Sequence, residues 1–145
     1  MENAEKNKVI EILYDHFMRQ YKNDEKKAVA AINYIGTLAQ KDGTNLVHFG
    51  RVVFMVSVVA KKMVEFHAMI GGNPSESEML KLLNKELDSL IKYLKQIGVA
   101  IAYTHMPTEK EKVFSNILEE YNFTKKKSTD DNGKNVIAFY IALEE

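Results

Sequence analysis

Hydrophobic residues near the start of the chain recur every three or four positions, which is the period of an α-helix with one buried face. The first such segment, residues 8–21, has the apolar stripe Ile10, Leu13, Phe17 and Tyr21. The second has the stripe Ala28, Ala31, Ile32, Ile35 and Leu38. Asn23 or Asp24 can cap the second segment, and Asp42-Gly43 is a turn signal beyond its end. The sequence therefore predicts two consecutive helices.

After this turn the pattern becomes that of β-strands. Residues 46–49 form a short strand candidate, and residues 51–59 are an almost unbroken apolar run, as expected of a central strand covered on both faces. Residues 63–70 alternate, which predicts an amphipathic strand. Its more apolar face carries Val64, Phe66, Ala68 and Ile70, and its other face carries Met63, Glu65, His67 and Met69.

A long helix is predicted after residues 71–74, whose sequence Gly-Gly-Asn-Pro ends the third strand. Ser75 and Glu78 have the spacing of a capping box, in which the Ser75 side chain accepts the Glu78 amide and Glu78 bonds back. Gly98 is placed to end the helix. Its apolar stripe is Leu80, Leu83, Leu87, Leu90, Leu94 and Ile97.

The rest of the chain predicts a strand at residues 99–103, a helix and a C-terminal hairpin. A second capping box, from Thr108 to Glu111, is expected to open this helix. The hairpin strands are residues 124–129 and 136–143, joined by a turn at residues 130–133. The three lysines at 125–127 fit a charged edge strand that is protected from aggregation.

Composition narrows the class of protein. A length of 145 residues suits one domain, residues 1–145. Lys plus Arg and Asp plus Glu are both 20, so there is no net field to attract nucleic acid or an anionic membrane. The absence of cysteine excludes disulfides, a zinc-thiolate site and a cysteine nucleophile. Residues 1–8 lack the apolar core of a signal peptide, and residues 52–60 are too short to span a bilayer. We expect a soluble, cytoplasmic protein without a nucleic-acid partner or membrane span.

The predicted order of elements resembles the Gcn5-related N-acetyltransferase (GNAT) fold, in degenerate form. That fold is α+β, with a mixed, mostly antiparallel sheet flanked by helices. Residues 121–123, Tyr-Asn-Phe, stand where the family often has a Gly-Phe pair leading into its sixth strand. The family's first strand has no counterpart, because residues 1–7 are not strand-like.

The resemblance implies a place for acetyl-CoA. In that family, the strand before the long helix pairs with the pantetheine arm, and the following loop and helix N-terminus hold the pyrophosphate. Exposed amides and the helix dipole attract such an anion. The residues that match this cofactor-binding segment are Ile70, Gly71, Gly72, Asn73 and Ser75.

The segment also departs from the family, whose basic, glycine-spaced loop is absent. Pro74 has no amide, and Glu76 and Glu78 place negative charge in the first turn of the helix. The capping box uses amides that a phosphate would need. We therefore expect this helix start to be satisfied by its own side chains.

The resemblance also implies catalytic positions. The family often uses a carboxylate on the matching strand as a base that acts through water, and Glu65 stands there. The tyrosine that protonates the departing thiolate corresponds to Leu118, which cannot donate a proton. Tyr121 or Tyr103 would have to replace it. No metal site is predicted: His67 and His105 with Glu65 match a two-histidine, one-carboxylate set, but without tight ligand spacing.

Two functions follow. The substituted loop and Leu118 favour a non-catalytic structural or adaptor protein, without a cofactor, that contacts other proteins of an assembly or its own copies. In length, element order and residues 70–73, the chain is similar to acetyltransferase-like internal virion proteins of short-tailed bacteriophages, which implies incorporation in a virion. The alternative is an active N-acetyltransferase that uses acetyl-CoA.

Overall fold

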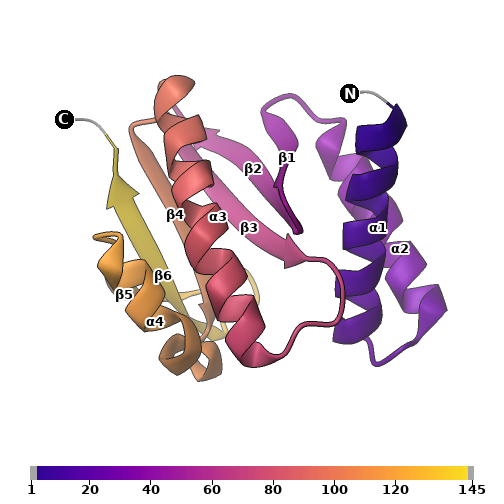
Figure 1. The fold of residues 1–145 in the computed structure, drawn as a ribbon. Coiled ribbons are helices and arrows are strands. Elements are labelled where there is room, and N and C mark those ends of the chain that lie inside the picture. The colour runs from indigo at the N-terminus through magenta and orange to yellow at the C-terminus, as the bar shows by residue number, and fades with distance from the viewer. Residues whose placement is uncertain (1–2, 144–145) are drawn as a thin grey trace. The chain divides into compact units, whose positions relative to one another are not determined.

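A computed structural model describes residues 3–143 and all their side chains except that of Glu109. The chain forms a six-stranded sheet in the order β1-β2-β3-β4-β6-β5, with helices between the strands (Figure 1). The elements are α1 (Asn3–Gln20), α2 (Glu25–Ala39), β1 (Thr44–Phe49), β2 (Val52–Ala60), β3 (Met63–Ile70), α3 (Glu76–Gln96), β4 (Ile101–Pro107), η1 (Thr108–Lys110), α4 (Glu111–Glu120), β5 (Thr124–Thr129) and β6 (Asn135–Ala142).

The predicted fold class and element order are confirmed. β3 pairs with β4 in parallel, whereas β1 with β2, β4 with β6 and β5 with β6 are antiparallel, so the sheet is mixed and mostly antiparallel. Of residues 1–7, predicted not to form a strand, those from Asn3 onward are helical, and residues 1 and 2 lie outside the described part. None of the described helices is long and apolar enough to cross a membrane.

The contacts divide the chain into two compact units. The first unit contains the chain up to Ser57 together with His67–Leu90, and the second contains Val58–Phe66 and the chain from Ile91 onward. β2, β3 and α3 each contribute residues to both units.

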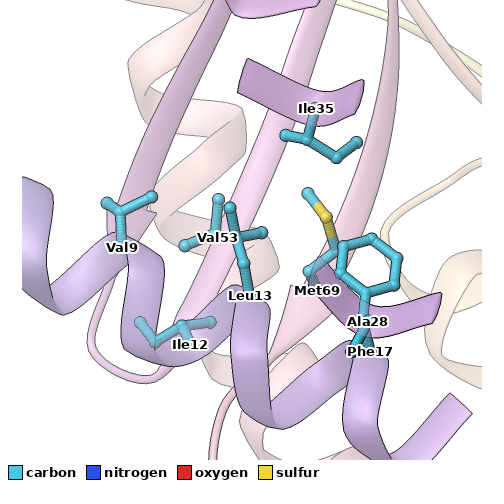
Figure 2. Close-up of a cluster of buried hydrophobic side chains, with 8 residues drawn as sticks. All are labelled: Val9, Ile12, Leu13, Phe17, Ala28, Ile35, Val53 and Met69. Atoms are coloured by element: carbon cyan, nitrogen blue, oxygen red, sulfur yellow. The ribbon is translucent and has the colours of Figure 1, made fainter. Parts of the chain in front are cut away.

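The core of the first unit lies where α1 and α2, which run side by side in Figure 1, meet residues of β2 and β3. Figure 2 shows its buried side chains. They are Val9, Ile12, Leu13, Phe17, Ala28, Ile35, Val53 and Met69. Burying each of these side chains other than Ala28 contributes about 1.5–3 kcal/mol. Asp24 caps α2 by accepting the Lys27 amide at 3.2 Å, as one of the two predicted caps.

Two strand faces differ from the prediction. Met69 was expected on the more polar face of β3, but it is only 4% exposed, because the end of this strand packs into the core of the first unit. β2 was expected to be covered along its whole length. Val52 and Val53 are fully buried, but Val58 and Val59 are 58% and 47% exposed, since the strand continues into an exposed turn at Lys61.

In the second unit, one face of the sheet packs against α4. Phe139 is fully buried on this face, and Phe66 contacts Phe123 with ring centroids 6.1 Å apart. Lys125 also lies on the side of α4, since its ammonium group is 3.2 Å from Glu111 and 3.6 Å from Glu119. The residues that alternate with these along β3, β4 and β6 therefore point to the opposite face.

The second predicted capping box is wrong. Thr108 begins the 3-10 turn η1, and α4 starts after it at Glu111 with no side-chain cap hydrogen bond. A capping residue needs an extended backbone. Lys110, which precedes α4, instead has helical angles of φ −90° and ψ −11°.

Candidate functional site

A carboxylate and a phenol meet on the sheet face of the second unit that points away from α4. The parallel ladder of β3 and β4 pairs Glu65 with Tyr103, so both side chains leave the sheet on the same face. The Tyr103 hydroxyl donates a hydrogen bond to Oε2 of Glu65 at 2.7 Å. Nδ1 of His105, two residues further along β4, lies 3.9 Å from Oε1 of the same carboxylate.

Tyr103 is held from a second side. Its ring stacks on Tyr140, its partner in the β4–β6 ladder, with centroids 5.4 Å apart and an angle of 25° between the planes. Burial of the hydroxyl and its hydrogen bond to Glu65 raise the pKa of Tyr103 well above its usual value. Tyr103 therefore stays protonated and donates a hydrogen bond to the Glu65 carboxylate at any physiological pH.

The Glu65 carboxylate opens into a cavity of about 390 Å³ within the second unit. The cavity runs from β3 over β4 and β6 to the β5–β6 turn. Its lining residues are Met63, Glu65, Tyr103, His105, Ser128, Thr129, Asp130, Asp131, Val136, Ala138 and Tyr140. The Glu65 side chain is 24% exposed, so it can reach water or a small ligand while Tyr103 fixes its orientation. Such a carboxylate can act as a general base.

The structure brings together only some of the predicted catalytic residues. Glu65 and Tyr103 are in contact, but Tyr121 is the C-cap residue of α4 and does not line this cavity. Leu118, at the family's usual tyrosine position, is 6% exposed and belongs to the core. Of the two predicted proton donors, Tyr103 is the one that contacts Glu65.

The predicted cofactor loop lies in the first unit, and much of its backbone is held by protein side chains. The Gly71 amide donates to the Arg51 carbonyl at 2.8 Å, and the Gly72 amide donates to Oδ2 of Asp15 at 2.8 Å. Arg19 donates to the carbonyls of Ile70 and Gly72 at 2.9 and 2.8 Å. These contacts fasten the loop to α1 and to the start of β2.

The two glycines of this loop lie where a larger residue would be strained or crowded. Gly72 has a φ of +76°, and a Cβ there would overlap the Arg51 guanidinium. A Cβ on Gly71 would lie 3.0 Å from Cγ1 of Ile12. Arg51 also donates to the Gly71 carbonyl at 3.0 Å. The positive φ therefore explains Gly72, and the close approach of Ile12 explains Gly71.

The first predicted capping box is confirmed. The Glu78 amide donates to Oγ of Ser75 at 3.2 Å, and the Ser75 amide donates to Oε1 of Glu78 at 3.4 Å. The amides of Asn73, Glu76 and Ser77 have no acceptor among the described residues. The start of α3 is thus satisfied in part by its own side chains.

Sequence reasoning missed the anchors of the loop: Asp15, His16, Arg19 and Arg51. His16 sits beside them and accepts the Ile70 amide on Nδ1 at 3.3 Å. Burial, with the nearby Arg19 charge as the second cause, lowers the pKa of His16 to about 4. The spacing of Asp15 and Arg19, four residues apart on one helix face, was the only local signal, because their partners are more than 50 residues away in the sequence.

Comparisons with known proteins were made on sequence and on structure. No protein-family model matches the chain, and no curated protein does. Solved structures do match. The aminoglycoside 6'-acetyltransferase type Ii has a TM-score of 0.69 at 9% identity, with 94% of this chain and 91% of that chain covered. The chain has the GNAT acetyltransferase fold.

Two further structures agree with this GNAT fold. A putative acetyltransferase from Salmonella typhimurium, solved with its cofactor acetyl-CoA, has a TM-score of 0.64 at 11% identity, with 99% of this chain and 92% of that chain covered. An N-acetyltransferase from Staphylococcus aureus Mu50 has a TM-score of 0.63 at 10% identity, with 99% and 96% covered. At such identities the likeness shows the fold, so the chemistry has to come from this chain's own residues.

Proposed function

We propose that this chain is an N-acetyltransferase that uses acetyl-CoA and accepts an amine in the cavity beside Glu65. The observation that carries the proposal is the Glu65 carboxylate, which Tyr103 orients at 2.7 Å on the wall of a cavity of about 390 Å³. The GNAT fold supports it, since the solved structures reported above are named as acetyltransferases.

Glu65 would work as the base. An amine that is protonated at neutral pH cannot attack a carbonyl carbon until it loses a proton. The partly exposed carboxylate of Glu65 can take this proton through one water molecule, while the Tyr103 hydrogen bond keeps the carboxylate aimed into the cavity. The departing thiolate can take its proton from water, because the raised pKa of Tyr103 makes this hydroxyl a weak acid.

Acetyl-CoA fits the loop in part. The amides of Asn73, Glu76 and Ser77, which have no acceptor among the described residues, would hold its pyrophosphate at the positive end of the helix dipole. The group supplies the acetyl thioester when bound. The carboxylates of Glu76 and Glu78 in the first turn of α3 repel the negative pyrophosphate, so we expect a modest affinity for acetyl-CoA.

Calorimetry with acetyl-CoA and an assay of thiol release with primary amines test the proposal. We expect micromolar binding, and we expect Glu65→Gln to lower kcat by about 100-fold or more while the Kd of acetyl-CoA stays the same, because a general base contributes at least that factor. Glu120→Gln, at an exposed position in the same unit, is the matched control. Unchanged turnover in Glu65→Gln would remove this residue from the mechanism.

The second candidate is a non-catalytic structural or adaptor protein, such as a virion component. The specific observation in its favour is that the amides of Gly71 and Gly72 are already bound to Arg51 and Asp15. Under this proposal acetyl-CoA at millimolar concentration gives no heat, and sedimentation shows an oligomer or a complex with a partner protein. A monomer that binds acetyl-CoA would contradict it.

A further inference from the structure

We propose that β5 is a docking edge for another protein, which adds an extended segment to it as a further strand of the sheet. The segment carries two consecutive acidic residues, and these lie opposite Lys126 and Lys127. β5 is the last strand in the sheet order, beyond β6. This inference goes beyond the proposed function, because it does not use the Glu65 carboxylate or acetyl-CoA.

The free edge of β5 is regular and uncovered. All residues of this strand are exposed, and none of them is a proline. Its register with β6 advances one residue at a time from Thr124↔Tyr140 to Thr129↔Asn135, so no bulge interrupts the ladder. By contrast, β1 at the other end of the sheet order is mostly half-buried and contacts α2. β5 therefore offers an open template to which another strand can be added.

The turn between β5 and β6 shows which backbone groups of β5 point outward. The Asp130 amide donates to the Lys134 carbonyl at 2.9 Å, so these residues form a hydrogen-bonded pair of the antiparallel ladder. Such pairs alternate along the ladder, and the residues between them direct their amides and carbonyls away from the partner strand. Counted back from Asp130, the residues that point away from β6 are Lys125, Lys127 and Thr129. Their amides and carbonyls can form the ladder of an added strand.

The charges along β5 decide which segment can pair there. The Lys125 ammonium group lies 3.2 Å from Glu111 and 3.6 Å from Glu119, so carboxylates already surround it. Lys126 and Lys127 have no ion-pair partner among the described residues. A side chain opposite one of them on an added strand would lie about 5 Å away, where an opposite charge is stabilising. Two neighbouring carboxylates therefore fit opposite Lys126 and Lys127.

A second copy of this chain fits the edge poorly. Full antiparallel pairing of two β5 strands would place Lys126 of each copy opposite Lys127 of the other. Like charges directly opposite each other destabilise a pair of strands. The lysines thus oppose self-association and favour an acidic segment, so the same residues both exclude one partner and select another.

The test titrates the full chain with the synthetic peptide acetyl-Thr-Val-Glu-Glu-Val-Thr-amide. Its valines and threonines favour an extended backbone, and its central glutamates can lie opposite Lys126 and Lys127 in either strand direction. We expect saturable shifts of the backbone amide NMR signals of β5 and slower hydrogen exchange at the amides of Lys127 and Thr129, which become bonded to the peptide. Added salt should weaken binding.

Matched variants and peptides make the test specific. Lys126→Gln combined with Lys127→Gln should weaken binding about fivefold, as expected for two exposed ion pairs. Lys134→Gln, at an exposed position of the turn, should leave the affinity unchanged. A peptide with proline in place of both valines keeps the charge but cannot complete the ladder, and a peptide with lysine in place of both glutamates reverses the charge. Neither peptide should slow the exchange of these amides.

The outcomes distinguish the parts of this inference. Equal binding of the proline peptide would overturn strand addition, and equal binding of the lysine peptide would overturn selection by charge. No shifts of the β5 amides at millimolar acidic peptide would overturn the docking edge. Dimerisation of the free protein that protects the same amides would show that a second copy occupies the edge instead. None of these measurements involves acetyl-CoA, so the proposed function is tested separately.

Discussion

Two regions of this molecule carry the residues that the fold would use for catalysis and cofactor binding, and their polar groups are engaged in different ways. In the second unit, the carboxylate of Glu65 is oriented by one phenol and opens into a cavity. In the first unit, the Gly71 and Gly72 amides of the loop after β3 donate hydrogen bonds to Arg51 and Asp15. The comparison shows that residue types alone would mark both regions as functional, and that the contacts of each group distinguish a carboxylate facing a cavity from amides already bound within the protein.

The largest effect that we expect in the first unit is a dependence of stability on pH, caused by His16 at the Ile70 amide beside the loop. The folded pKa of His16 is about 4 against an ordinary value of 6.5, so its neutral form stabilises the fold above pH 6.5 and this stability is lost as the pH falls toward 4. The shift corresponds to roughly 3 kcal/mol. Urea titrations at several pH values measure it.

Two variants make this pH test specific. His16→Gln should flatten the dependence between pH 6.5 and 4, because no imidazole then titrates at the Ile70 amide. His48→Gln, on β1, should leave the dependence as it is. If His16→Gln keeps the full slope, the loop is not held by the neutral imidazole.

The next effect concerns Gly72. Gly72→Ala should lower the free energy of unfolding by about 2 kcal/mol, because an alanine at positive φ is strained and its Cβ displaces the Arg51 guanidinium from the Gly71 carbonyl. Gly98→Ala is the matched control, since Gly98 has a φ of +84° and nothing within 4 Å of its Cβ position. The difference between the two losses, measured by chemical denaturation, is the part due to Arg51. Equal losses would show that the Arg51 contact adds nothing.

The smallest expected effect is a change in the affinity for acetyl-CoA, and it tests most directly whether the loop contacts compete with a ligand. Asp15→Asn removes a negative charge from the acceptor of the Gly72 amide, so acetyl-CoA should bind about threefold more tightly, as expected for one partly exposed charge. Calorimetry measures the change. Glu11→Gln, one turn earlier on α1 and exposed, is the control. An unchanged or lower affinity in Asp15→Asn would mean that this carboxylate does not compete with the ligand.

Sequence patterns predicted the features that are set by residues close together in the sequence. The alternation of β3 and the capping box of Ser75 and Glu78 depend on residues two or three positions apart. The structure shows the capping box, and it shows the alternation from Met63 to His67. The Thr108 capping box has the same spacing, but the chain leaves β4 through a 3-10 turn, which the spacing does not reveal.

The loop anchors could not be predicted in this way. Asp15 and Gly72 are 57 residues apart, and only the packing of α1 against the end of β3 brings them together. The contact of Glu65 with Tyr103 was easier to predict, because the pairing of β3 with β4 places both side chains on one face of the sheet. Which of the predicted tyrosines meets Glu65 still depended on the register, which the sequence does not state.

The position of Tyr103 affects how quickly the Glu65 carboxylate can act once a ligand is bound. Its ring is stacked on Tyr140 and its hydroxyl is bonded to Glu65, so the carboxylate has lost most of its rotational freedom before any ligand arrives. That entropy is given up once, during folding, instead of at each encounter. A group immobilised in advance needs little rearrangement when a proton is to be moved.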